Sequence, residues 1–177
     1  MEMSDSREIK ADRMTVWAGI LSPEVLKSCV PGCQEMTGSA EDGFEALVVQ
    51  KVGPVKATFR GVVVLTDVIE GESLTLSGEG KGGAAGFAKG GAKLKLEDLP
   101  GGSTKLIYDV EAKVGGKLAQ LGSRIIDGFA KKMADQFFAT FAETVEGGGE
   151  SDSSDDGAET ATTDDEKKGW LKRTLGR

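Results

Sequence analysis

The 177-residue chain contains no histidine and no asparagine. Without histidine it lacks the side chain that most often serves as general base, as metal ligand and as partner of a nucleophilic serine or cysteine. Its carboxylates are scattered, and no pair of them stands out as an acid–base couple. We therefore expect a protein that is not an enzyme, with no catalytic residue and no metal site.

Cysteine is scarce as well, with only Cys29 and Cys33, which are separated by Val-Pro-Gly. A tetrahedral zinc site needs four nitrogen or sulfur ligands, and a chain without histidine offers two. The spacing also differs from that of a redox C-x-x-C pair. Two reduced thiols beside a turn are the simplest interpretation.

Long apolar runs are missing too, and none approaches the ~20 residues needed to span a bilayer. The acidic start, Met1–Asp5, lacks the apolar segment of a signal peptide, so we expect a cytoplasmic protein. The net charge is −7, and no basic stripe is evident before the C-terminal end, which argues against a nucleic-acid partner.

The C-terminal end has two segments of opposite character. Residues 147–166 carry eight carboxylates and no lysine or arginine among small residues, which predicts a disordered acidic linker. Residues 167–177 carry five positive charges and no negative one. This basic amphipathic tip is typical of a segment that becomes helical on an anionic membrane, with weak and reversible attachment. A dock on a partner protein or a mere solubilising tail are the alternatives. The residues expected to contact the membrane are Lys167, Lys168, Trp170, Leu171, Lys172, Arg173 and Leu175.

The part of the chain before the linker shows changes of periodicity. Residues 3–11 alternate weakly, which predicts a first strand. Asp12 and Ser22 are placed to cap two short helices, the second of which ends at Pro31-Gly32. In residues 33–113 apolar side chains recur at every second position, which predicts antiparallel strands joined by short turns. The predicted strands are 44–52, 55–69, 73–82, 86–98 and 103–113.

An apolar stripe at helical spacing follows and predicts one long helix from Gly115-Gly116 to about Glu146, ended by the glycine run 147–149. Such a helix would be ~48 Å long at ~1.5 Å per residue. The expected fold class is α+β: a curved antiparallel sheet wraps around the long C-terminal helix, with two short helices, in a single domain of residues 1–146.

The hairpin predicted over 73–98 has almost no side-chain bulk on one face. Gly78, Gly80 and Gly82 share that face, while charged residues alternate with them. A sheet face without side chains leaves space or lets another backbone approach closely. Either an apolar cavity lies between sheet and helix, or the helix fills the gap. Phe87 falls on the charged face unless a bulge turns it inward, and Tyr108 would be a polar contact or a core residue. The candidate cavity residues are Phe59, Val63, Leu65, Gly78, Gly80, Phe87, Tyr108, Leu118, Leu121, Ile125 and Phe129.

An ordered set of short stretches resembles one known family. The stretches are Val16-Trp17, Pro23–Leu26, Cys29–Cys33, Val52–Gly61, Gly78–Gly91, Gly116–Arg124 and Phe137-Phe138. Together they resemble the G subunit of carbon monoxide dehydrogenase (CoxG) over roughly residues 1–146. The resemblance implies a START-like helix-grip fold of the SRPBCC superfamily, which commonly encloses apolar ligands. It also implies a non-catalytic role beside the molybdenum–copper carbon monoxide dehydrogenase, in bringing that enzyme to the membrane.

These expectations combine into one functional hypothesis and one alternative. The hypothesis is an accessory protein that holds a non-covalently bound respiratory isoprenoid quinone, or another lipid, in its cavity. It would link the carbon monoxide dehydrogenase complex to the electron acceptor at the inner face of the cytoplasmic membrane. The alternative is a pure membrane-recruitment adaptor without a functional ligand.

Overall fold

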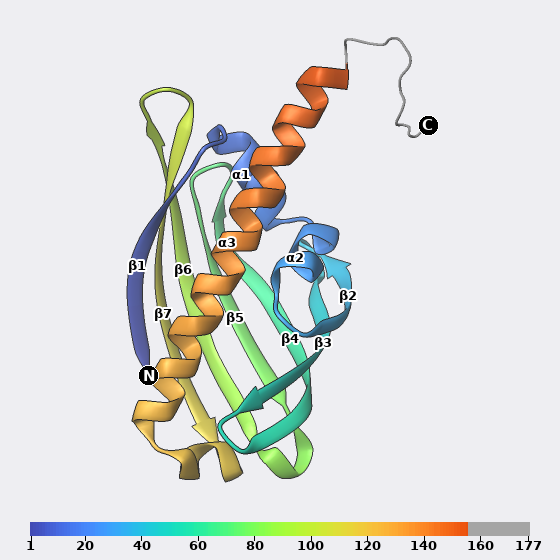
Figure 1. Ribbon diagram of the computed structural model, residues 1–177, viewed down its shortest axis with the longest axis vertical. Coiled ribbons are helices and arrows are strands. Elements are labelled where there is room, and N and C mark those ends of the chain that lie inside the picture. Colours follow the sequence, from blue (N-terminus) through green and yellow to red (C-terminus); the bar gives the residue numbers. More distant parts are fainter. Residues whose placement is uncertain (156–177) are drawn as a thin grey trace. The chain divides into compact units, whose positions relative to one another are not determined.

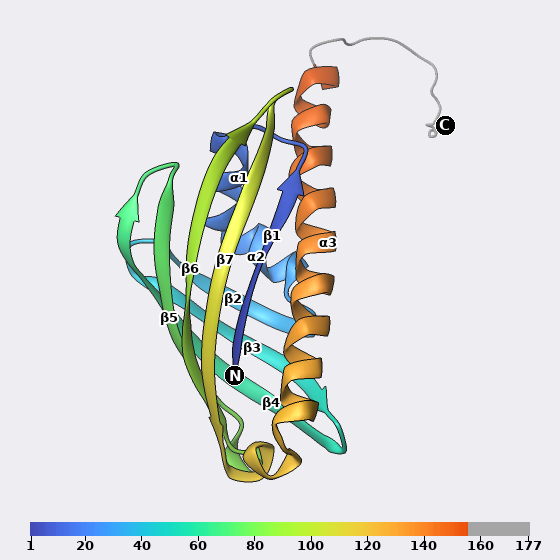
Figure 2. The ribbon, with the colours of Figure 1, turned by 90° about the vertical axis from the view of Figure 1, so that its left-hand side faces the viewer.

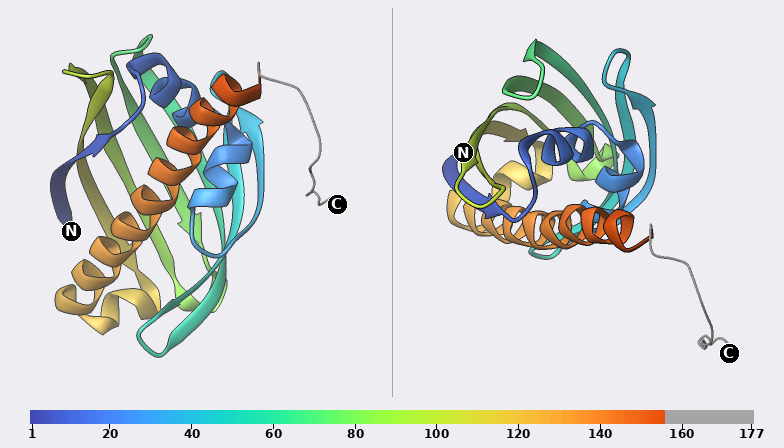
Figure 3. Two further views of the ribbon diagram at one scale, coloured as in Figure 1. Left: turned by 45° about the horizontal axis from the view of Figure 1, so that its top comes forward. Right: turned by 90° about the horizontal axis from the view of Figure 1, so that it is seen from above.

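The computed structural model describes the backbone of residues 1–155 and the side chains of residues 1–147. The chain divides into two units, Met1–Val145 and Glu146–Arg177, and the whole sheet lies in the first. In that unit a curved sheet bends around one long helix and two short ones (Figures 1 and 3). The predicted fold class is therefore confirmed.

Seven antiparallel strands form the sheet in the order β1-β7-β6-β5-β4-β3-β2. From β2 to β7 each strand pairs with the next one along the chain, as the short turns predict. Only β1 departs from this order, since it pairs with β7 and forms the far edge (Figure 2). The strands are β1 (Glu2–Ile9), β2 (Cys33–Ser39), β3 (Gly43–Val52), β4 (Val55–Ile69), β5 (Ser73–Lys81), β6 (Phe87–Leu99) and β7 (Ser103–Gly115).

The two short helices lie where the capping signals place them, with α1 at Arg13–Ile20 and α2 at Pro23–Cys29. The Ser22 hydroxyl accepts a hydrogen bond from the backbone N–H of Val25 at 3.3 Å, which satisfies a donor in the first turn of α2. The long helix α3 spans Ser123–Asp155, and its part up to Val145 packs with α1 and α2 on the concave side of the sheet (Figure 3).

The predicted bounds of the long helix are wrong at both ends. Strand β7 continues to Gly115, and a 3₁₀ helix, η2 (Gly116–Leu121), separates it from α3. Gly116 and Gly122 have φ angles of +74° and +90°, far from the α-helical value of about −63°. Leu118 and Leu121 therefore lie on η2. At its other end the backbone of α3 stays helical to Asp155, beyond the glycine run that was expected to end it.

Strand β2 is absent from the predicted strands. It lies at an edge of the sheet and is mostly polar, so it has no alternating apolar face to reveal it. A second short 3₁₀ helix, η1 (Gly83–Ala85), joins β5 to β6.

The hydrophobic core occupies one end of the concave face. There α1, α2 and α3 pack against β1, β5, β6 and β7. Gly19 of α1 lies so close to α3 that an added Cβ would be 2.8 Å from a methyl carbon of Val145. The buried Thr104 hydroxyl donates to the Ala11 carbonyl at 2.7 Å and ties β7 to the start of α1. The core cluster comprises Ile9, Val16, Trp17, Ile20, Cys29, Leu74, Leu96, Leu106, Tyr108, Phe141 and Val145.

Candidate ligand-binding site

The other end of the concave face, beside the β3–β4 turn and the β5–β6 connection, is lined by small residues. We call it the turn end. Gly80 on β5 pairs with Gly61 on β4 and with Ala88 on β6, and in the neighbouring row Gly78 pairs with Gly90. A Cβ added at Gly80 would meet no atom within 4 Å, so there is open space in front of this residue. We refer to this space as the Gly80 hollow.

The glycines of the hairpin do not all serve the same purpose. A Cβ at Gly90 would lie 2.1 Å from the Glu111 carbonyl oxygen, so this glycine lets β6 approach β7 closely. A Cβ at Gly82 would lie 2.4 Å from the ring of Phe59, so this glycine makes room for an aromatic side chain. The glycine pattern therefore serves close approach of a backbone at Gly90 and of a ring at Gly82, while open space lies beside Gly80, and an apolar cavity there stays a prediction.

The predicted cavity walls fall mainly at the turn end of the concave face. Phe59, Val63 and Leu65 alternate along the inner side of β4 and are half-buried, while the residues between them point outward. Leu118 is buried on η2, and Phe129 is half-buried on α3. The core cluster itself contains Tyr108 alone of the predicted set, with Leu65 packed against it.

Two further predicted residues lie beside the turn between β3 and β4. A Cβ at Gly53 would be 3.7 Å from Ile125 and 3.9 Å from Leu121. Ile125 is 41% exposed, so it lies at the outer boundary of this apolar group. The β3–β4 turn thus lies against η2 and the first turn of α3.

The prediction that Phe87 faces the cavity is wrong. The register of β6 against both neighbouring strands runs unbroken from Phe87 onward, so no bulge turns it inward. Its ring lies where a Cβ of Gly115 would be, and it is 42% exposed on the outer face.

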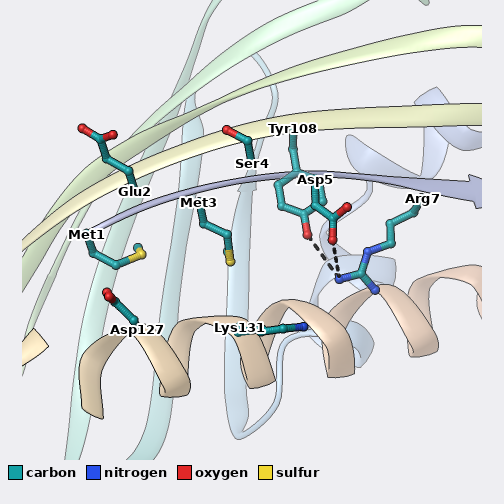
Figure 4. A pocket seen from close by; sticks show the side chains of 9 residues that line it. All are labelled: Met1, Glu2, Met3, Ser4, Asp5, Arg7, Tyr108, Asp127 and Lys131. Atoms are coloured by element: carbon teal, nitrogen blue, oxygen red, sulfur yellow. Dashed lines mark hydrogen bonds and ion pairs between the residues drawn. The ribbon is translucent and has the colours of Figure 1, made fainter. Parts of the chain in front are cut away.

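A lateral pocket of about 260 Å³ opens between β1 and the first turns of α3 (Figure 4). Met1, just before β1, and Met3 on β1 extend toward the helix, and Asp127 and Lys131 line the helical side. Arg7 and Tyr108 lie at the end nearest the core (Figure 4). The pocket therefore combines flexible apolar side chains with several charged groups.

Arg7 organises the polar end of this pocket. Its Nη2 donates to the Asp135 carboxylate at 2.6 Å and to the Tyr108 hydroxyl at 3.2 Å. The guanidinium also lies 5.1 Å from the ring centroid of Phe138, within the range of a cation–π contact. Its Nε is buried and has no hydrogen-bond partner in the described part of the chain. Arg7 is not among the residues predicted from the sequence, although its spacing from Met3 and Ile9 in a strand puts all three on one face.

The Arg7–Asp135 pair shifts the pKa of both groups. Burial lowers the pKa of Arg7, but its hydrogen bonds to Asp135 and Tyr108 outweigh this, so the net shift is upward. The hydrogen bond from Arg7, assisted by Lys131, holds the pKa of Asp135 below its ordinary value. Tyr108 is buried and stacks on Phe138 with a centroid distance of 4.9 Å, so it is both a core residue and a pocket residue.

Replacing Asp135 by asparagine is expected to remove a pH-dependent part of the stability. Because the pKa of Asp135 is lowered in the folded state, the pair stabilises the fold above the ordinary pKa of 3.8. This contribution is lost as the pH falls through the lowered value. Urea midpoints at pH 7 and at pH ~3 should show a deficit for Asp135→Asn that shrinks at acid pH. Asp42→Asn, in the exposed β2–β3 turn, is the control, and a deficit independent of pH would contradict the assignment.

The two cysteines are free thiols, with Cys29 buried and Cys33 half-buried. Burial raises the pKa of both thiols, which makes them less reactive at neutral pH. Among the described residues no cluster of three acidic or cysteine side chains could hold a metal ion. No helix in this part of the chain is long and apolar enough to cross a membrane.

One protein family matches this chain over most of its length. The family of the G subunit of carbon monoxide dehydrogenase (CoxG) matches residues 6–146. The chain belongs to the CoxG family. No protein with a curated description matches the sequence. The resemblance inferred from the short stretches is thus confirmed.

Solved structures agree with the helix-grip fold. A conserved protein from Geobacillus kaustophilus is 27% identical, with a TM-score of 0.77, and the match covers 82% of this chain and 95% of that one. A START superfamily protein from Mycobacterium smegmatis is 14% identical, with a TM-score of 0.63 and coverage of 82% and 97%. A protein from Thermus thermophilus is 12% identical, with a TM-score of 0.65 and coverage of 84% and 99%. The last two similarities show the fold alone.

Proposed function

We propose that this protein is a non-catalytic accessory protein of carbon monoxide dehydrogenase that carries an isoprenoid quinone, or a lipid of similar shape, in the Gly80 hollow. The observation that carries the proposal is the open space in front of Gly80 on the concave face, at the turn end and away from the core cluster. Membership of the CoxG family supports the dehydrogenase as partner.

A quinone fits the chemistry that such an accessory protein would serve. Oxidation of carbon monoxide releases two electrons in a water-soluble enzyme, and a quinone takes up two electrons and two protons to become a quinol. Its isoprenoid tail must be shielded from water, which the small-residue face and its apolar walls would do. The redox steps belong to the dehydrogenase, and the accessory protein only delivers and removes the carrier.

Membrane attachment through the C-terminal tip completes the proposal. Residues 167–177 lie outside the described part of the chain, so this step depends on their sequence. Three large apolar side chains among five cations suit weak, reversible binding at the inner face of the cytoplasmic membrane. The protein would then act in the cytoplasm and visit the membrane to exchange its ligand.

Organic extraction and mass spectrometry of the freshly purified protein test the ligand. We expect an isoprenoid quinone at close to one per chain. Traces of mixed lipid, from a protein that still sediments with anionic vesicles, would instead support an adaptor without a functional ligand.

Removing residues 167–177 is expected to weaken sedimentation with vesicles that contain anionic lipid, because five cations and Trp170 are lost. High salt should weaken the binding of the full chain in the same way. Equal binding by the full and shortened chains would contradict the role of the tip.

A further inference from the structure

Eight cations gather at the turn end of the sheet, although the protein as a whole is acidic. They lie in residues 51–60, 80–90 and 112–124, and these three segments contain no aspartate or glutamate. The complete chain has 22 lysines and arginines against 29 acidic residues, so this local excess is strong. We call the group the basic rim. It comprises Lys51, Lys56, Arg60, Lys81, Lys89, Lys113, Lys117 and Arg124.

The fold brings the three segments of the basic rim to one place. The β3–β4 turn, the β5–η1–β6 connection and the β7–η2–α3 connection all lie at the lower end of the sheet in Figures 1 and 2. A Cβ at Gly86 would lie 2.0 Å from the Gly115 carbonyl oxygen, and one at Gly53 would touch Ile125. All eight side chains are exposed, and in the described part of the chain none of them forms an ion pair.

The register places several of these cations directly opposite one another. Lys51 pairs with Lys56, Arg60 with Lys81, and Lys89 with Lys113, while on its other side Lys89 lies opposite Glu79, with which it forms no ion pair. Like charges opposite each other in a sheet are destabilising. An anionic partner at this end would offset that repulsion, which no ion pair within the described chain does.

Two exposed apolar side chains indicate which kind of anionic partner fits. Phe87 is 42% exposed and pairs with Lys81. Ile125 is 41% exposed and lies in the first turn of α3. Aromatic and aliphatic side chains among cations are typical of a surface that meets the head groups of a bilayer. Lys81 follows Gly80 on β5, so its side chain points to the outer face while the Gly80 hollow lies on the opposite, concave face of the same strand.

We propose that the basic rim is a second membrane-docking surface, separate from the C-terminal tip, which seats the turn end of the folded domain on anionic lipid. Docking in this orientation seats the outer face of the turn end on the bilayer and brings the Gly80 hollow, on the other face of the same strands, close to the membrane, which would shorten the path of an apolar ligand between the two. The passage of ligand rests on the proposed function, whereas docking itself does not. The eight cations are dispersed along the chain, so they do not appear as a basic stripe in the sequence and come together only in the fold.

Vesicle binding by full-length variants tests the docking surface. The five cations of the tip are replaced by glutamine in every variant, so that the rim acts alone. The rim variant adds Lys81→Gln, Lys89→Gln and Lys113→Gln, and the matched control adds Lys27→Gln, Lys93→Gln and Lys132→Gln, which are exposed elsewhere. The vesicles contain phosphatidylcholine with or without phosphatidylglycerol.

Each cation near an anionic membrane strengthens binding about fivefold, so the rim variant should bind the anionic vesicles about a hundredfold more weakly. The control should bind as strongly as the parent protein, in which only the five tip cations are replaced. None of the three proteins should bind strongly to vesicles of pure phosphatidylcholine. Equal weakening by both triple variants, or no binding by the parent, would overturn the proposal. So would unchanged vesicle binding with lost binding to the dehydrogenase, since the rim would then be a protein interface.

A fluorescence measurement tests the orientation. In a full chain carrying Trp170→Phe, Phe87→Trp is expected to be quenched by brominated anionic lipid. Val68 is another exposed apolar residue, and it lies at the end of β4 that is far from the turn end. The tryptophan in Val68→Trp should therefore not be quenched. Quenching at position 68 alone would reverse the orientation and overturn the proposal. A protein that docks by its rim but contains no quinone would refute the proposed function and leave the docking surface standing.

Discussion

Replacement of Gly80 by phenylalanine is expected to abolish binding of the apolar ligand while leaving the protein folded. A Cβ at this position meets no atom within 4 Å, so the new side chain projects into the hollow instead of clashing with the sheet. Gly80 does not have a positive φ, and phenylalanine favours strands more than glycine does. The stability should therefore be unchanged or slightly raised, while the space for the ligand is lost.

The matched control for this variant is Ser77→Phe on the same strand. Ser77 is exposed on the outer face, so the same aromatic ring is added without entering the hollow. Extracted quinone per chain should fall at least about tenfold for Gly80→Phe and stay unchanged for Ser77→Phe. Urea unfolding of both variants reports the folded state. A folded Gly80→Phe protein that keeps its full quinone content would place the ligand elsewhere, for example in the lateral pocket beside Arg7.

The parts of the fold that sequence predicted correctly are those with a local signal. Strands β3 to β7 alternate over many residues, and Ser22 followed by Pro23 marks the start of α2. The start of α3 was misplaced because apolar side chains on η2 continue its helical spacing, whereas the break lies in the backbone of Gly116 and Gly122. Periodicity of side chains does not reveal a change of backbone conformation at glycine.

The site was predicted only in part, for a different reason. The small-residue face of β5 and β6 is a pattern within one hairpin, so Gly78 and Gly80 were placed on the correct face. Arg7 and Asp135 are 128 positions apart, and their contact depends on β1 pairing with β7 at the sheet edge. The basic rim likewise depends on three turns meeting in space. No single segment carries either feature.

Phe141→Ala is expected to reduce the free energy of unfolding by about 3–5 kcal/mol, the largest loss of stability that we predict for a single substitution. Phe141 is fully buried, stacks on Phe137 with a centroid distance of 5.8 Å, and lies against Gly19 of α1. Alanine would leave a cavity where α1 meets α3, and the close packing at Gly19 limits how far the helices can move to fill it.

Urea and thermal unfolding at pH 7 measure this loss, and Phe87→Ala is the matched control. The control removes the same atoms from a side chain that is 42% exposed, so it should change stability by less than about 1 kcal/mol. Similar losses for the two variants would mean that Phe141 is not the centre of the core. The folded fraction of Phe141→Ala should still bind quinone, because the core and the Gly80 hollow occupy opposite ends of the concave face. Gly80→Phe should show the reverse, with the ligand lost and the stability kept. Opposite effects of the two substitutions would establish that one end of the sheet serves folding and the other serves binding.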